Sequence, residues 1–587
     1  MEDAKKRKLT SDDPSVWLKW FEEMSEEENE KDEESCSEIE ADILEESPHD
    51  TASEQEAGDL ESDNDCDDIS DSESENFYIG KDKFTKWCKV KPRQNVRTRS
   101  CNIIIHLPGP RREAHGVQKE IDILKFFLDD NVFRMIVAST NIKIGVVREK
   151  YCRARDAADT DVTEICAFIG LLYLIGSLRC SRKNMHDLWD NSRGNGLESC
   201  YLTMSENRFK FLLRCLRFDD IRDRHMRKEV DKLCSIRDLH ELLINNFQRY
   251  FCASEYLTVD EQLLAFRGNC SFRQYIPSKP AKYGLKIFAL VDCKTGYTIN
   301  LEPYVGKQPE GPYQVGNSGE EIVLRLCNPV EGTNRNITAD NWFTSVTVSE
   351  RLLLEKKLTY VGTMRKNKRE IPKEFLPNKS IPAKSSIFGF GKNSTLVSYC
   401  LKKGKSVILL SSMHFDDTID VSTGDHKKPE IVTFYNMTKV GVDLVDQLCQ
   451  KYDVSRNTRR WPLVMFYNLL NISAINAFVI YKANTRESTQ IQRRIFLQNI
   501  SWELIKPQIE RRTAVLTIPK EIRRRARVLL GIEESTVPQK RPGTRGRCLP
   551  CGRQRNKTTR RWCCKCQIWA CGEHLTDICL QCLENTN

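Results

Sequence analysis

The N-terminal region of this 587-residue chain lacks the residues that build a protein core. No Phe, Trp or Tyr occurs between residues 22 and 76, and this stretch is dense in Glu, Asp and Ser. Such a segment cannot bury enough apolar surface to offset the chain entropy that folding removes. We therefore predict a disordered, acidic N-terminal region over residues 1–95.

Long uninterrupted hydrophobic runs are also missing. The N-terminus has no apolar stretch of the kind that a signal peptide carries. Residues 165–175 are too short to span a bilayer, and residues 463–480, although long enough, contain Asn468, Asn471 and Asn476. We expect both runs to be core helices and expect no association with a membrane. The 24 cysteines are then expected to be mostly reduced, in the cytosol or the nucleus.

Positive charge is scarce at the N-terminus and abundant afterwards. Residues 1–80 contain 30 Asp or Glu against 6 Lys or Arg, so the remaining 507 residues carry +32 within a total of +8. A folded part this basic indicates a polyanionic partner. The acidic tail either keeps the chain soluble or competes with nucleic acid for the basic surface. The cluster KKRK at residues 5–8 is typical of an import signal, which predicts a nuclear protein.

The strongest candidates for a catalytic site are carboxylates, with no evident Ser-His-Asp or Cys-His set in the same segments. A short β-prone run ends at Asp340, and an amphipathic segment follows over residues 346–357. A second short strand carries Asp260 near its end. A helical run then begins with Asp443 and Asp446, one turn apart on the same face.

Carboxylates from two strands and a helix suit Mg²⁺, which prefers oxygen ligands and leaves coordination sites for water and phosphate. Two such ions close together can activate a nucleophile and stabilise the leaving oxygen in phosphodiester transfer. The alternative is that these are ordinary surface acids of a charge-rich chain.

Four motifs occur in the order typical of piggyBac-type transposases, and the chain resembles that family from about residue 97 to its end. The motifs are VDEQLLAFRG (259–268), YIPSKPAKYGLK (275–286), DNWFTS (340–345) and GVD (441–443). The resemblance implies a ribonuclease H-like catalytic core. In that core Asp260, Asp340 and Asp443 would bind two Mg²⁺ ions, with Asp446 as the nearby fourth catalytic acid.

The predicted fold is α/β, with several domains in series. Apolar residues at three-to-four spacing indicate a mostly helical region up to residue 254, and the resemblance implies that it serves dimerisation and DNA binding. The predicted order is a helical domain (112–254), the catalytic core (255–365), an inserted β-rich domain (366–430), the rest of the core (431–456), the rest of the helical domain (457–530), a basic linker (531–546) and a cysteine-rich zinc-binding domain (547–585).

Smaller patterns predict individual elements. Residues 285–291 and 297–304 are typical of a hairpin, with Asp292 in the turn rather than on a metal. Residues 396–401 and 406–411 predict a second hairpin, and residues 103–107 predict a strand.

Three arginines next to a tryptophan are candidates for DNA contacts. Arg456, Arg459 and Arg460 beside Trp461 suit a DNA backbone with an unstacked base. Packing of Trp461 in the core is the alternative. Pro462 is expected to break or restart the helix at this point.

Eight cysteine and histidine residues near the C-terminus have the spacing of zinc ligands. The pairs are Cys548 and Cys551, Cys563 and Cys566, Cys571 and His574, and Cys579 and Cys582. Such pairs in a reducing compartment predict two tetrahedral Zn²⁺ sites rather than disulfides. By analogy with cross-brace fingers, the first and third pairs would share one ion and the second and fourth pairs the other. Cys564 is a spare thiol.

The resemblance implies a cut-and-paste DNA transposase that binds transposon ends as a homodimer and catalyses metal-dependent cleavage and strand transfer at TTAA targets in double-stranded DNA. One alternative is a domesticated nuclear DNA-binding protein that mobilises nothing, although the presence of all four acids favours the enzyme. Another is that the zinc module reads chromatin proteins, which leaves the acids unexplained.

Overall fold

The computed structural model describes residues 76–93, 98–192, 194, 196–277, 279–532, 545–563 and 568–575. The predicted acidic region up to residue 75 lies outside the described residues, as do most of the basic linker and Cys564, Cys566, Cys579 and Cys582 of the cysteine module. The chain divides into two compact units, residues 1–507 and 508–587.

One large mixed sheet forms the framework of the first unit. Within the described residues its strand order is β1-β2-β11-β12-β13-β10-β9-β5-β7-β6, with β8 paired to β7. Strand β9 lies parallel between β5 and β10, whereas β5–β7 and β7–β8 are antiparallel. The strands are β1 (Phe77–Ile79), β2 (Lys86–Cys88), β5 (Tyr256–Ala265), β6 (Gln274–Tyr275), β7 (Tyr283–Asp292), β8 (Thr298–Pro303), β9 (Asn336–Ala339), β10 (Thr359–Thr363), β11 (Ser385–Phe390), β12 (Thr395–Lys402) and β13 (Lys405–Ser411).

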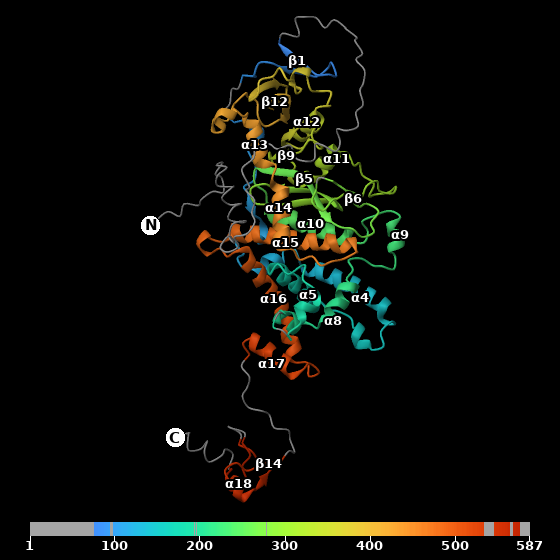
Figure 1. Ribbon diagram of the computed structural model, residues 1–587, viewed down its shortest axis with the longest axis vertical. Helices are drawn as coiled ribbons and strands as arrows, with labels where there is room; N and C mark the ends of the chain where they lie inside the picture. Colours follow the sequence, from blue (N-terminus) through green and yellow to red (C-terminus); the bar gives the residue numbers. More distant parts are fainter. Residues whose placement is uncertain are drawn as a thin grey trace, which may run out of the picture. The chain divides into compact units, whose positions relative to one another are not determined.

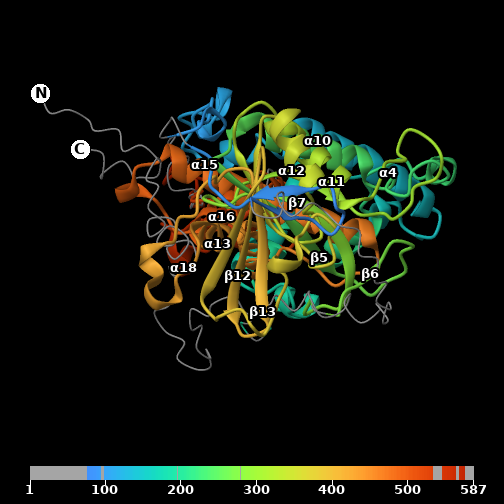
Figure 2. The same ribbon diagram turned by 90° about the horizontal axis from the view of Figure 1, so that it is seen from above.

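Both predicted hairpins are present. Strands β7 and β8 pair as expected, and the Asp292 carboxylate between them accepts hydrogen bonds from the backbone N–H groups of Ser254 and Lys294 at 2.7 and 2.9 Å. Strands β12 and β13 also pair, and Figure 2 shows them running side by side. Together with β11 they occupy the segment predicted to be an inserted domain, and they continue the main sheet through β10.

Helices cover the sheet and form a second layer beyond it. Helices α10 and α15 lie between the sheet and the group α4, α5 and α8 (Figure 1). The helices of this layer are α3 (Glu120–Leu124), α4 (Asp130–Arg148), α5 (Val162–Ser177), α6 (Met185–Trp189), α7 (Glu198–Thr203), α8 (Glu206–Cys215), α9 (Arg224–Lys228), α10 (Arg237–Tyr250), α15 (Trp461–Asn484) and α16 (Arg493–Thr513). Four more accompany the strands: α11 (Gly319–Leu326), α12 (Val346–Leu354), α13 (Glu430–Thr438) and α14 (Gly441–Lys451).

Helix α15 is the core helix that the sequence predicts. Among the described residues it is the one helix long and apolar enough to cross a membrane, and 94% of its apolar window is buried inside the protein. Its asparagines are hydrogen-bonded within the fold, since Asn476 both accepts from and donates to the Thr298 backbone at 2.9 Å. Pro462 lies in the first turn, where a missing backbone N–H costs nothing. The predicted restart of the helix at Pro462 is confirmed.

Residues 103–107 do not form the strand that their apolar pattern predicts. The Ile103 and Leu107 side chains are 55% and 82% exposed, and the Ile105 N–H donates to the Thr333 carbonyl at 3.4 Å. A strand needs a neighbouring edge to pair with, and a short run of β-prone residues does not supply one.

The described part of the second unit is small. It contains α17 (Lys520–Leu529), a two-stranded sheet of β14 (Gly546–Arg547) and β15 (Thr558–Thr559), and α18 (Gly552–Arg555). Cys548, Ala570 and Cys571 form its small buried cluster.

Candidate active site and metal centre

Two predicted acids lie next to each other where the parallel ladder of β5 and β9 ends. Asp340 directly follows β9, but β5 continues to Ala265, so Asp260 lies in the middle of its strand and not near the end as expected. The ladder between β5 and β9 pairs Val259 with Ala339, so the residues that follow, Asp260 and Asp340, occupy neighbouring positions. Both side chains are half-buried. Burial, and after it the charge of Asp340, raise the pKa of the Asp260 carboxyl to about 8. Two carboxylates held this close resist ionising together.

The DNWFTS motif is the turn that carries the chain from β9 to α12. The Asp340 carboxylate accepts a hydrogen bond from the Trp342 N–H at 2.6 Å, and the Thr344 hydroxyl donates to the Asp340 carbonyl at 2.8 Å. Ser345 then caps α12 by accepting from the Val348 N–H at 3.1 Å. These bonds fix the Asp340 side chain at the end of the strand.

Gly441 allows the helix that carries the third predicted acid, Asp443, to pack closely against β5. A Cβ atom on Gly441 would lie 2.6 Å from the Thr258 hydroxyl, so only glycine allows the first turn of α14 to pack this closely against β5. The Thr258 hydroxyl also donates to the Thr438 carbonyl just before the helix, at 2.6 Å. Helix α14 thereby brings Asp443, whose side chain is exposed, to the site.

Asp446 belongs to the same cluster. Its carboxylate accepts a hydrogen bond from the Gln262 amide at 2.7 Å, which ties α14 to β5. Burial raises the pKa of Asp446 to about 7, and the charge of Asp443 adds to the effect. The charge of Asp443 also raises the pKa of Asp260. The structure thus brings all four predicted acids together.

The donor set fits a divalent cation. Four carboxylates from two neighbouring strands and one helix face repel one another, and a bound ion that prefers oxygen ligands relieves that repulsion. One nearby cation, Lys279, compensates part of the charge, because it lowers the pKa of both Asp260 and Asp446. Its ammonium group donates to the Glu261 carbonyl at 3.4 Å. The role of Lys279 was not predicted from the sequence.

Metal affinity should depend on pH because Asp260 holds a proton up to about pH 8 in the metal-free protein. Metal binding must displace that proton, so we expect Mg²⁺ affinity to rise up to about tenfold per pH unit towards pH 8 and to level off above it. Calorimetric titrations at several pH values, in buffers that differ in ionisation enthalpy, measure both affinity and proton release. The Asp260→Asn variant should bind Mg²⁺ weakly and with a flatter pH dependence. Affinity that is constant from pH 6 to 8 would contradict this expectation.

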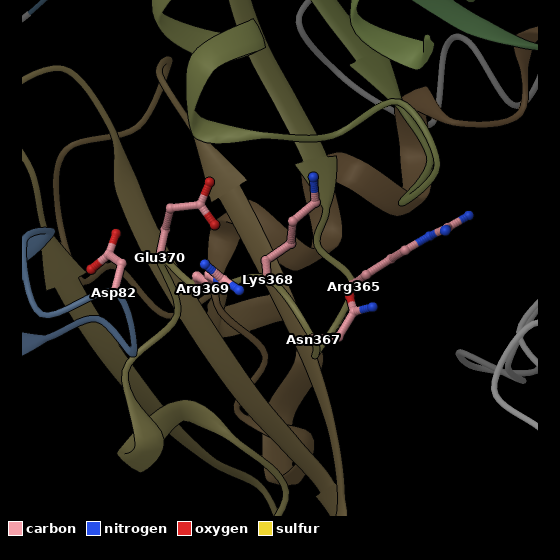
Figure 3. Close-up of a pocket in the computed structure, with 6 residues that line it drawn as sticks. All are labelled: Asp82, Arg365, Asn367, Lys368, Arg369 and Glu370. Carbon is pink, nitrogen blue, oxygen red and sulfur yellow. The ribbon is translucent and has the colours of Figure 1, made fainter. Parts of the chain in front are cut away.

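A basic loop borders the acids. After β10, the Arg365 guanidinium donates to the Asn341 side chain at 3.1 Å, directly beside Asp340. The loop continues past an open hollow of about 550 Å³, and Figure 3 shows the residues that line it: Asp82, Arg365, Asn367, Lys368, Arg369 and Glu370. This surface was not predicted from the sequence, although the density of basic residues after β10 is a signal for it.

The predicted DNA contacts near Trp461 are corrected in part. Arg456 is 8% exposed, and its guanidinium donates to the carbonyls of Ser181 and Lys183 at 2.7 and 2.8 Å. The Arg460 guanidinium likewise donates to backbone carbonyls at the end of α8, including that of Leu216.

These two arginines therefore hold the chain between α14 and α15 in place instead of offering charge to a ligand. The Trp461 ring packs edge-on against Phe272 at 5.0 Å, which is the core-packing alternative. Arg459 is exposed and remains a candidate contact.

In the second unit, four cysteine and histidine residues form a compact cluster. Ligand atoms of Cys548, Cys551, Cys571 and His574 all lie within 4.8 Å of one another. The Cys571 sulfur is 3.3 Å from His574 Nδ1, and this contact lowers the pKa of the Cys571 thiol to about 6. A Cys₃His set is compatible with Zn²⁺.

The cluster combines the first and third of the predicted ligand pairs. Of the other two pairs only Cys563, which is buried, is described.

Comparison with known proteins gives concordant matches. The model of the Transposase IS4 family matches residues 119–478. Two human proteins are similar over 64% of the chain: piggyBac transposable element-derived protein 3, at 22% identity over 400 residues, and protein 5, at 23% over 391 residues. The matched regions span 63% and 73% of these relatives, so the first is covered over less than two thirds of its length.

A solved structure is also similar. The cryo-EM structure of a piggyBac transposase synaptic complex with hairpin DNA matches with a TM-score of 0.68 and 37% identity, covering 81% of the present chain and all of that one.

Proposed function

The chain belongs to the piggyBac-type transposases, and we propose that it is a DNA transposase that cleaves transposon ends and joins them to a TTAA target with the aid of Mg²⁺. The observation that carries this proposal is the convergence of Asp260 in the middle of β5, Asp340 just after β9 and Asp443 in the first turn of α14. An ordinary set of surface acids would not be assembled by a parallel strand pair and a glycine-dependent helix contact.

We assign a ribonuclease H-like core to β5, β7, β8, β9 and β10 with α12 and α14. Three antiparallel strands adjoin a parallel pair, and the acids lie at the junction between them. This arrangement supports the assignment because it places two carboxylates side by side on neighbouring central strands. The helical residues before β5 and after α14 would form the dimerisation and DNA-binding domain.

In the proposed mechanism Asp260, Asp340 and Asp443 would hold two Mg²⁺ ions. Bound Mg²⁺ would supply charge stabilisation and an activated water for phosphodiester hydrolysis. Asp446, fixed by Gln262 and with a pKa of about 7, would orient that water or hold its proton. The Asp340 turn keeps its carboxylate in one orientation, so the protein does not have to reorganise during the reaction.

The basic loop would hold the DNA backbone beside the acids. Arg369 is exposed and Lys368 half-buried on the hollow next to the site. We expect Lys368→Ala and Arg369→Ala each to weaken duplex binding and to lower the slope of log affinity against log salt by about 0.9 for each phosphate that is no longer neutralised. Fluorescence anisotropy with labelled end DNA over a salt series measures this slope.

The matched control for this loop is Lys403→Ala, which removes an exposed lysine at the β12–β13 turn. Its slope should stay that of the intact chain. If all three variants kept the parental slope, the loop would not be a phosphate-binding surface.

The remaining features extend the proposal. The C-terminal module would be a cross-brace finger that holds two Zn²⁺ ions and contacts the terminal repeats. The similar solved structure is a synaptic complex, which supports action on paired ends by a homodimer, and the basic cluster at residues 5–8 supports a nuclear location.

A second candidate function is a domesticated DNA-binding protein, because two relatives are named as transposable element-derived. Binding to end DNA without cleavage would favour it.

A further inference from the structure

A short hairpin at one edge of the main sheet carries an exposed aromatic side chain at its tip. Strands β1 and β2 are joined by residues 80–85, and Phe84 in this tip is 86% exposed. Lys83 has a φ of 63°, a conformation that side-chain-bearing residues rarely adopt. The Asp82 carboxylate stabilises the turn by accepting hydrogen bonds from the N–H groups of Phe84 and Thr85 at 3.0 and 2.9 Å. Phe84 is therefore presented on a defined turn.

The hairpin is fastened to the basic loop beside the active site. The Trp87 ring is 2% exposed, and its Nε1–H donates to the Glu370 carbonyl at 2.9 Å. The Asp82 N–H donates to the Arg369 carbonyl at 3.0 Å. Because these bonds reach the loop backbone directly, the hairpin tip and the loop form one surface.

That surface is strongly basic. The Lys81 ammonium group donates to the Lys366 carbonyl at 2.9 Å, which adds its charge to those of the loop. The basic residues of the tip and the loop are Lys81, Lys83, Arg365, Lys366, Lys368 and Arg369, whereas Asp82 and Glu370 are the two acids among the lining residues of the hollow. A surface with this excess of positive charge attracts a polyanion.

The contacts define a path from the acids to the tip. Arg365 bonds to Asn341 beside Asp340, and the Arg369 carbonyl accepts from the Asp82 N–H of the hairpin. Between these two contacts the loop passes along the hollow (Figure 3). DNA whose phosphate lies at the acids and whose backbone follows the loop therefore reaches the hairpin.

We propose that the tip of the β1–β2 hairpin is a DNA-binding wedge: Phe84 packs into the groove or between bases of the duplex at the active site, while Lys83 neutralises a phosphate. Apolar side chains used in this way partly unstack a base step and bend the duplex. The inference rests on the proposed function, because it takes duplex DNA as the ligand of the acid site.

Photo-crosslinking tests the contact directly. Benzoylphenylalanine is placed at position 84 of the full-length chain, and at Leu107 or Val421 as controls that are 82% and 92% exposed. Each protein is irradiated with labelled end DNA without divalent metal, so that no cleavage occurs. Crosslinking from position 84 should exceed that from either control by about tenfold or more, since direct stacking contacts are specific to one surface. Equal yields from the three positions would overturn the inference.

Two substitutions at position 84 test whether the aromatic ring itself contacts DNA or only lies near it. Phe84→Ala should lower strand transfer into target DNA by about tenfold, because removal of an aromatic–base contact has an effect of this order, whereas Phe84→Trp should retain transfer. Neither change should shift the melting temperature, since the side chain is 86% exposed. Equal transfer by both variants would count against the wedge.

The experiments distinguish failure of the proposed function from failure of the wedge. If the intact chain binds no duplex DNA by anisotropy, the proposed function itself is wrong. If it binds and cleaves DNA but position 84 crosslinks no better than the controls, the wedge alone is wrong.

Discussion

Asp340→Asn is expected to reduce cleavage of end DNA by at least about 1000-fold, because it removes a carboxylate ligand at the point where the proposed ions and the scissile phosphate meet. The hydrogen bond from the Trp342 N–H to Asp340 can be accepted by the amide oxygen of asparagine, so the turn into α12 should survive. Purified intact and variant proteins are compared on a labelled duplex with Mg²⁺, with circular dichroism and DNA affinity measured in parallel.

Glu261→Gln is the matched control for this substitution. Glu261 follows Asp260 on β5 and therefore points to the opposite face, where it pairs with Lys286. The substitution removes one negative charge at the adjacent position without touching the proposed ligands, so cleavage should stay within about tenfold of the parent. Similar reductions in both variants would mean that the effect is a general one on the strand. Full activity of Asp340→Asn would contradict the proposed site.

Cys571→Ser is expected to unfold the cluster of Cys548, Cys551, Cys571 and His574, the proposed Zn²⁺ site. Structural Zn²⁺ binding contributes about 10 to 16 kcal/mol in small zinc modules, which is more than such a module can replace by burying apolar surface. Cys571 contributes a sulfur 3.6 Å from that of Cys551 and 3.3 Å from His574 Nδ1, so the substitution removes a central ligand. Zinc content by mass spectrometry should fall by one ion per chain, and residues 545–575 should become sensitive to protease.

Cys152→Ser serves as the control for removal of a thiol, since Cys152 is exposed and lies outside the cluster. Its zinc content and protease resistance should equal those of the parent. A Cys571→Ser protein with unchanged zinc content would show that the cluster does not hold the ion.

The acids could be found from the sequence because local pattern determines their placement. The strand that ends before Asp340 and the helix face of Asp443 and Asp446 are visible as periodicity, and the motif order implied that Asp260, Asp340 and Asp443 act together; the structure places Asp260 and Asp340 on neighbouring strands. What periodicity cannot show is the role of Gly441, because a close approach between a helix and a strand depends on tertiary contact. The same holds for the contact of Lys279 with Glu261.

Basic residues were harder to assign. A run of arginines looks the same in sequence whether its guanidinium groups face solvent or bind carbonyls, and Arg456 and Arg460 do the latter. The loop at Arg365–Arg369 and the hairpin at Trp87 lie far apart in the chain, so no local sequence pattern could predict their contact. The strand predicted at residues 103–107 was wrong, because β-prone residues without a neighbouring strand to pair with stay outside the sheet.

Excision from a plasmid tests the proposed transposase function most directly. A marker flanked by the terminal repeats of this element is supplied together with the intact protein or with Asp340→Asn, at equal protein level and with equal end binding verified. We expect excision by the intact protein and none above background by the variant. Binding of the ends by the intact protein without any excision would contradict the proposed function and would identify the chain as a DNA-binding protein that no longer mobilises DNA.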